Sequence, residues 1–234
     1  MFDTRVNNKD KLLEQLSDLF ANKLAEPMLS AVNAFALQYY RVSPVEELLE
    51  RRLENLYGAT LSAWRFIQEY QVDQPKVRVY NPDFEQHGWH CNHTVIEILQ
   101  GDMPFLVDSV RMELARQELA IHAIHNAVLR VERDDNNQLC ELHEAGSKSR
   151  KAGAESVIYL EVDRHNDQEE LKAISQGLLD VLTDVRLAVS DYQPMQQRVQ
   201  ALITELGQAP AVLDADEIKE SQAFLKWMLQ DHFT

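Results

Sequence analysis

The chain has 234 residues, and 45% of them are hydrophobic, so it can bury a core of its own. Its 38 acidic and 23 basic residues give a formal net charge of −15, which argues against nucleic acids and anionic membrane surfaces as partners. Two cysteines, Cys91 and Cys140, are too few for a disulfide framework and predict reduced thiols. A polar N-terminus and the lack of an apolar run of about 20 residues predict a soluble, cytoplasmic protein.

The first 72 residues are predicted to form a helical segment of two or three packed helices. Apolar residues recur at steps of three and four from Leu12 to Leu24, which gives an amphipathic stripe. A further helix is predicted to begin at residues 43–46, SPVE, because serine can cap a helix and proline is favoured at its first position. We assign these stripes to the core of the protein and not to chemistry.

The pattern changes near residue 75 to an α+β domain that is expected to extend to residue 190. Alternating or apolar runs predict strands at 75–82, 93–99, 121–133, 139–144 and 156–163, and helices at 103–118 and from 167 to about 185. This order indicates a ferredoxin-like βαββαβ antiparallel sheet with both helices on one face. The fourth strand is missing after the second helix, and either residues 75–82 or a partner chain could supply it.

The remaining segments are predicted to connect or extend this domain. Residues 146–155 are rich in Gly, Ser and Lys, which is typical of a loop. Residues 191–234 are expected to be a helical linker that leads into a further domain. Apolar spacing predicts one separate helix around 195–206 and another around 218–229.

No dinucleotide fingerprint, P-loop, nucleophile elbow, CxxC pair or HExxH helix occurs in the sequence, so we predict no catalytic residue and no cofactor in this chain. The candidate metal ligands are two HxxH pairs, His90 with His93 and His122 with His125, and Cys91 beside the first pair. On strands, an offset of three places the members of a pair on opposite faces. The third strand of the sheet would also separate the first from the second. We therefore predict that the pairs do not converge and that no metal is bound.

The sequence GDMPFLVDSVRMEL at 101–114 resembles the strand–helix corner of ACT domains, which typically read Asp-x-Pro-Gly-Leu and share the βαββαβ order. ACT domains are commonly regulatory modules that bind amino acids. Phe105 stands where that family usually has glycine, whose missing Cβ lets the backbone approach a ligand. This departure from the ACT pattern predicts that the Phe105 ring fills a core or an interface, while Asp102 can still cap the helix. The candidate effector-binding or interface residues are Asp102, Met103, Pro104, Phe105 and Asp108.

A longer resemblance covers most of residues 37–234. It is carried by YY at 39–40, SPVEELLERR at 43–52, LYGATLSAWRF at 56–66, VRVYNP at 77–82, the GDMPFLVDSVRMEL corner, EVDR at 161–164 and AFLKWMLQDHFT at 223–234. Together these sequences resemble the N-terminal region of the large bacterial NAD-specific glutamate dehydrogenases. The resemblance implies a parent enzyme that converts L-glutamate to 2-oxoglutarate and ammonia with NAD, in a catalytic region far downstream.

Two functions are compatible with this resemblance. The chain could be a non-catalytic scaffolding module that contacts downstream domains of the same chain and further copies in a homo-oligomer. Alternatively, it could be an amino-acid sensor of the ACT type, whose effector shifts the activity of the parent enzyme by binding two states unequally.

Overall fold

The computed structural model describes residues 2–72, 74–144, 146–147, 149–208 and 214–232. The chain divides into two compact units, residues 1–183 and 184–234. Within the described residues, no helix combines the length and the apolar character that crossing a membrane requires.

The N-terminal segment forms four helices, and not the two or three predicted. It contains α1 (Phe2–Lys23), α2 (Met28–Tyr39), α3 (Val45–Leu49) and α4 (Leu53–Ile67). The apolar stripe of α1 faces inward, since Leu12, Leu16 and Phe20 are buried. The expected serine cap is wrong, because α3 begins one residue later than predicted, with Pro44 at its N-cap, and the Ser43 hydroxyl has no hydrogen-bond partner among the described residues.

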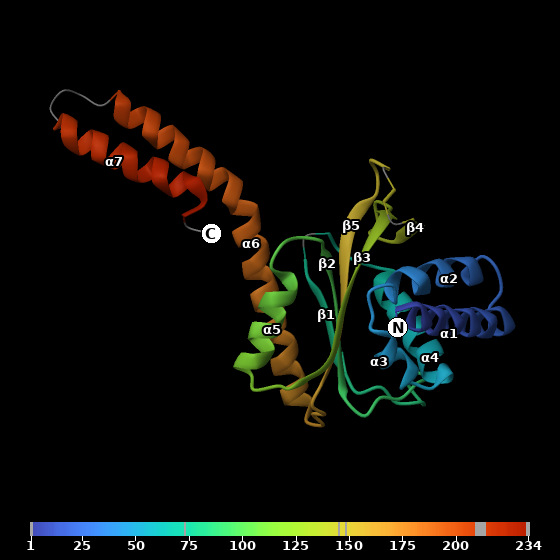
Figure 1. The fold of residues 1–234 in the computed structure, drawn as a ribbon. Helices are drawn as coiled ribbons and strands as arrows, with labels where there is room; N and C mark the ends of the chain where they lie inside the picture. The colour runs from blue at the N-terminus through green and yellow to red at the C-terminus, as the bar shows by residue number, and fades with distance from the viewer. Residues whose placement is uncertain (1, 73, 145, 148, 209–213, 233–234) are drawn as a thin grey trace. The chain divides into compact units, whose positions relative to one another are not determined.

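The sheet has five antiparallel strands in the order β1-β2-β5-β3-β4 (Figure 1). These are β1 (Lys76–Tyr80), β2 (Thr94–Gly101), β3 (Ile121–Arg133), β4 (Leu139–His143) and β5 (Gly153–Val162). The missing fourth strand is therefore β1, which pairs with β2 at the edge of the sheet. β5 starts earlier than expected and takes in the end of the predicted loop, because the long β3 offers it a partner as far as Val131.

Helices cover both faces of this sheet. α5 (Leu106–Arg116) and the first part of α6 (Gln168–Gly207) lie on one face, and α1–α4 lie on the other (Figure 1). Val95, Leu99 and Val157 belong to one core with α1–α4, while the alternate residues Ile96 and Ile158 are buried on the opposite face. Because both faces are covered, β2 and β5 are buried along nearly their whole length.

The second unit contains the end of α6 and α7 (Ala215–Trp227), followed by a π-helical turn, Met228–His232. The two separate helices predicted before residue 207 are wrong, since α6 is one helix of 40 residues with Pro194 inside it. A proline removes a single hydrogen bond of a helix and can be tolerated with a kink. α7 returns beside the end of α6, where the Gln222 side chain donates to the Ile203 carbonyl oxygen at 2.7 Å.

Candidate functional site

The strand–helix corner that the sequence singled out has a strained start. The residue at the N-cap of α5 is Phe105 and not Asp102, and no side chain caps the helix there. Phe105 has a φ of 71°, in the left-handed region that favours glycine. Its side chain is 66% exposed, so it does not fill the core. The expectation of an interface remains a prediction.

Two of the other candidate residues, Asp102 and Met103, hold the corner onto the sheet. Asp102 accepts a hydrogen bond from the Ser156 hydroxyl at 2.6 Å, so its carboxylate is engaged with β5 instead of capping α5. The Met103 sulfur accepts a hydrogen bond from the Gln100 side chain at 3.5 Å. Asp108 lies in the first turn of α5.

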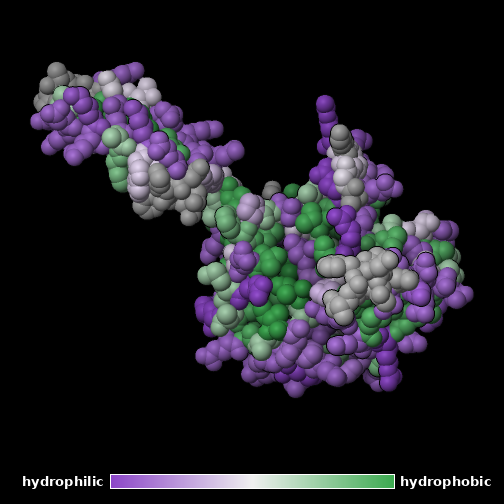
Figure 2. Space-filling view, viewed as in Figure 1, coloured by the Kyte–Doolittle hydropathy of each residue, from purple (hydrophilic) through white to green (hydrophobic). Residues whose placement is uncertain are grey.

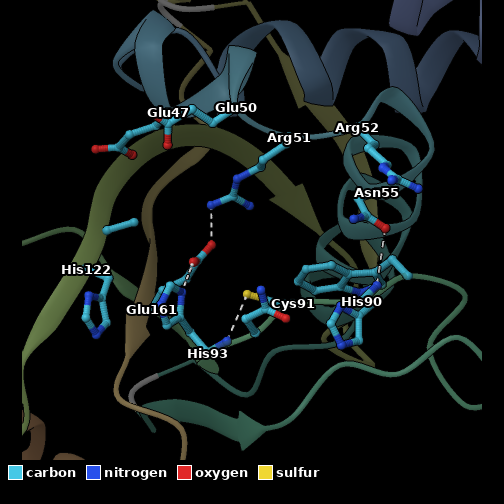
Figure 3. Close-up of a pocket in the computed structure, with 13 residues that line it drawn as sticks. Glu47, Glu50, Arg51, Arg52, Asn55, His90, Cys91, His93, His122 and Glu161 are labelled. Atoms are coloured by element: carbon cyan, nitrogen blue, oxygen red, sulfur yellow. Dashed lines mark hydrogen bonds and ion pairs between the residues drawn. The ribbon is translucent and has the colours of Figure 1, made fainter.

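A pocket of about 420 Å³ lies away from this corner and is lined mainly by polar side chains (Figure 3). They come from the α3–α4 junction, the loop before β2 and neighbouring ends of β3 and β5. The lining residues are Glu47, Glu50, Arg51, Arg52, Asn55, Trp89, His90, Cys91, Asn92, His93, His122, Ala123 and Glu161. None of the five corner residues is among them. The loop packs closely on α4 at Gly58, where a Cβ would lie 2.5 Å from the Cβ of Trp89.

Glu161 is buried and has partners on both carboxylate oxygens. Arg51 forms an ion pair with its Oε1, which also accepts a hydrogen bond from the Tyr159 hydroxyl at 2.7 Å. Its Oε2 lies 2.8 Å from Nδ1 of His93. Burial alone would raise the pKa of Glu161, but Arg51 and the hydrogen bonds from Tyr159 and His93 hold that pKa below its ordinary value. The carboxylate is therefore charged at neutral pH.

The predicted separation of the two histidine pairs is wrong for one member of each. The rings of His93 and His122 stack with their centroids 4.2 Å apart. β5 lies between β2 and β3, as predicted, but the rings of His93 and His122 meet at the end of β5 where Glu161 and Val162 lie. Ile121 pairs with Val162 and Ala123 with Glu161, so His122 is the extra residue of a β-bulge. A bulge redirects a side chain that strict alternation would place elsewhere.

Cys91 joins this group from the loop before β2. Its sulfur accepts a hydrogen bond from the backbone amide of His93 at 3.4 Å. Burial raises the pKa of the Cys91 thiol to about 11, and the nearby Glu161 carboxylate contributes to the rise. Ligand-type atoms of Cys91, His93 and Glu161 all lie within 4.8 Å of one another. The sequence placed Cys91 beside His93, but nothing in it pointed to Glu161, which lies 68 residues after His93.

The other two histidines have different surroundings. His90 is exposed and stacks on Phe84. His125 is only 8% exposed and stacks on Tyr159 with a centroid distance of 4.9 Å. Within the described part of the chain, its Nε2 has no hydrogen-bond partner. Burial, together with the positive charge of Arg51, lowers the pKa of His125 to about 3, so the ring is neutral at physiological pH.

The strand order, the two helices on one face and the strand–helix corner define an ACT-like α+β domain. The chain belongs to the family described as glutamate dehydrogenase, ACT1 domain, whose model matches residues 35–178. The matched range contains every residue that lines the pocket.

Two relatives are similar over almost all of the chain. It is 48% identical over 224 residues to an NAD-specific glutamate dehydrogenase of Halomonas elongata, and 43% identical over 227 residues to one of Pseudomonas aeruginosa. The alignments cover 95% and 97% of this chain but only 14% of each relative. The resemblance seen in the sequence is thus confirmed, and the chain corresponds to the N-terminal region of such an enzyme.

Proposed function

We propose that this chain is a non-catalytic scaffolding segment of a large NAD-dependent glutamate dehydrogenase. The parent enzyme would convert L-glutamate, NAD and water to 2-oxoglutarate, ammonia and NADH, with NAD bound by other parts of the longer chain. The relatives carry the name of that activity, and the chain spans 14% of their length. The scaffolding surface would dock onto downstream domains or onto another copy in a homo-oligomer.

Two exposed apolar side chains, Phe105 at the start of α5 and Met112 within it, are the observation that carries this proposal. Phe105 is 66% exposed, and Met112, two turns further along the same side of the helix, is 72% exposed. Hydrophobic residues gather on the surface beside α5 (Figure 2). Exposed apolar groups of this kind favour a protein–protein contact. Phe105 also occupies a backbone conformation in which glycine would be unstrained. That a bulky residue stands there supports a role for its ring in a contact surface.

The assembly of the full-length parent enzyme tests the scaffolding role. We expect Phe105→Ser and Met112→Ser each to lower the mean molecular mass measured by light scattering at micromolar protein. Arg111→Ser, at an exposed polar position of the same helix, is the matched control and should leave the mass unchanged. An unchanged mass in both apolar variants would refute docking of this surface onto another copy. Formation of NADH from glutamate and NAD by the 234-residue chain alone would refute the non-catalytic role.

A second candidate function is an amino-acid sensor. The pocket carries guanidinium groups of Arg51 and Arg52 and carboxylates of Glu47 and Glu50, so it offers partners for both charges of an amino acid. In a thermal-shift screen, an effector present at 100 times its Kd would stabilise the chain by about 2.7 kcal/mol. If the amino acid binds in the pocket, Arg52→Ala should abolish the rise in melting temperature. If it binds at the strand–helix corner, Asp102→Ala should abolish that rise instead. A flat response to all amino acids at millimolar concentration would eliminate the sensor.

A further inference from the structure

Three side chains of different chemical type meet at one end of the pocket (Figure 3). The thiol of Cys91, a ring nitrogen of His93 and a carboxylate oxygen of Glu161 lie within 4.8 Å of one another. Cys91 and His93 come from the loop before β2 and Glu161 from the end of β5, so the tertiary fold brings them together. Thiolate, imidazole and carboxylate are the three ligand classes that zinc accepts in proteins.

We propose that Cys91, His93 and Glu161 bind one zinc ion, with a water molecule from the pocket in the fourth position. Zinc displaces the thiol proton of Cys91 to solvent, and the proton on Nδ1 of the neutral His93 ring moves to Nε2, so that Nδ1 binds the ion while the imidazole stays neutral. The inference does not depend on the scaffolding function, since it concerns only side chains inside this chain.

The separations of the ligand atoms suit a tetrahedral ion after small adjustments. Zinc bonds of about 2.0–2.3 Å place neighbouring tetrahedral ligand atoms roughly 3.3–3.6 Å apart. Nδ1 of His93 and Oε2 of Glu161 are 2.8 Å apart, and no separation in the group exceeds 4.8 Å. Side-chain rotations can supply the difference. The pocket of about 420 Å³ has room for the fourth ligand, water.

Neighbouring groups already orient two of the three ligands. Oε1 of Glu161 is held by Arg51 and the Tyr159 hydroxyl, which leaves Oε2 directed at His93. The ring of His93 stacks on the ring of His122, with the two centroids 4.2 Å apart. Nε2 of His122 lies within hydrogen-bond distance, 2.7 Å, of Oδ1 of Asp163. Outer contacts of this kind hold ligands in place in metal sites and raise their affinity for the ion.

The charge of the pocket permits a cation in spite of Arg51. Glu47, Glu50 and Glu161 supply three carboxylates against the two guanidinium groups of Arg51 and Arg52. A thiolate at Cys91 adds a further negative charge when the ion binds. A divalent ion therefore enters a pocket of net negative charge, within a chain whose formal net charge is −15.

The reactivity of the two cysteines tests the site without any substitution. The chelator-treated 234-residue chain is titrated with Zn²⁺ alone, metal content is measured after gel filtration, and each thiol is labelled with a maleimide. We expect one zinc per chain and at least tenfold slower labelling of Cys91, with the rate at the exposed Cys140 unchanged. Equal slowing at both thiols, or no stoichiometric zinc at micromolar free metal, would overturn the proposal.

Substitutions then assign the ligands. Cys91→Ser and His93→Gln should each lower zinc affinity at least tenfold. Cys140→Ser and His90→Gln are matched controls that keep the wild-type affinity. His143→Gln disrupts the other group of ligand-type side chains found among the described residues, and it too should leave the protection of Cys91 intact. Thermal unfolding of the zinc-free variants checks their fold. If a control loses as much affinity as the ligand variants, the assignment is wrong.

Discussion

Phe105 occupies a left-handed backbone conformation, with a φ of 71°, that costs a side chain with a Cβ about 1 kcal/mol. Because its ring is exposed, little buried contact offsets this cost within the chain. We expect Phe105→Gly to raise the free energy of unfolding of the chain by about 0.5–1 kcal/mol, as measured by urea denaturation.

A paired variant separates the backbone effect from the loss of the ring. Phe105→Ala keeps the Cβ and removes only the phenyl group, so it should leave stability unchanged or slightly lower. If alanine stabilises the chain as much as glycine does, backbone strain is not the cause. Reduced assembly of a stabilised Phe105→Gly parent enzyme would show that this residue is retained for a contact.

His125 makes stability depend on pH. Burial, reinforced by Arg51 and Lys9 and opposed by Glu161, lowers its pKa to about 3, whereas an unfolded histidine titrates near 6.5. Between these values the unfolded state binds more protons, so stability falls as the pH falls. From pH 6.5 to pH 5 the loss attributable to His125 should be roughly 1.5–2 kcal/mol.

Urea denaturation of wild type and His125→Phe at both pH values measures this contribution. The difference in unfolding free energy between pH 6.5 and pH 5 should shrink in His125→Phe by the stated amount. The control variant His90→Gln, at an exposed histidine, should keep the wild-type difference. Identical pH dependence in His125→Phe and wild type would contradict the buried, neutral state of His125.

At the scale of elements, a buried ion pair joins two strands to the end of a helix. The guanidinium of Arg133, on β3, makes two bonds of 2.7 Å to the carboxylate of Glu155, on β5, and also donates to the carbonyl oxygens of Ile67 and Gln68. Removing one partner of a buried pair leaves an uncompensated charge and costs about 3–5 kcal/mol. Arg133→Met should therefore destabilise the chain by that amount in denaturant unfolding.

A double-mutant cycle identifies the reason for that loss. Adding Glu155→Leu to Arg133→Met removes the carboxylate that Arg133→Met leaves unpaired. The free energy of unfolding should therefore fall by less in the double variant than the two single losses added together. Additive losses would mean that the backbone contacts of Arg133, and not its pairing with Glu155, carry the effect.

Gly58 sets the distance between α4 and the loop that carries Cys91 and His93. A Cβ there would lie 2.5 Å from the Cβ of Trp89 and 2.8 Å from the carbonyl oxygen of Gly88. Overpacking of this kind costs about 1–3 kcal/mol, which outweighs the gain in helix propensity of about 1 kcal/mol. Gly58→Ala should therefore lower the thermal unfolding midpoint.

A second helical glycine provides the matched control. The atoms nearest to a Cβ at Gly177, on α6, belong to the flexible side-chain ends of Glu113 and Gln117, which can move aside. Gly177→Ala should therefore cost less than Gly58→Ala in the same thermal measurement. An equal loss in both variants would mean that the rigid contact with Trp89 is not decisive.

At the scale of the whole first unit, the sheet depends on helices from both ends of its sequence. Val95, Leu99 and Val157 share a core with α1–α4, so removing these helices would expose an apolar sheet face. The predicted ACT-like domain of residues 75–190, produced alone, should lack a cooperative thermal transition in circular dichroism. A chain that lacks residues 208–234, and so ends after α6, should retain one. A sharp transition in the isolated 75–190 segment would show that it folds independently of α1–α4.

The local pattern of apolar and polar residues was enough to predict the type and the order of most helices and strands. The apolar, β-branched run at residues 156–163 and the periodic stripe from Leu171 to Leu182 each predict one element, because side-chain direction repeats within a few residues. The order of these elements indicated a ferredoxin-like sheet, the motif at 101–114 resembled ACT domains, and several segments between residues 39 and 234 together resembled the glutamate dehydrogenase family. The same local signal placed the strand at 75–82 without showing where it pairs.

Only the tertiary structure decided the contacts between segments that are distant in the sequence. Pairing placed β1 beside β2, and the bulge at His122 turned its ring toward His93. The meeting of Cys91 and His93 with Glu161 likewise depends on segments about 70 residues apart. Such contacts follow from strand register and from the packing of layers. Strand register and layer packing do not produce a repeating pattern of apolar residues in the local sequence. The residues that line the pocket could therefore not be predicted to come together from the sequence.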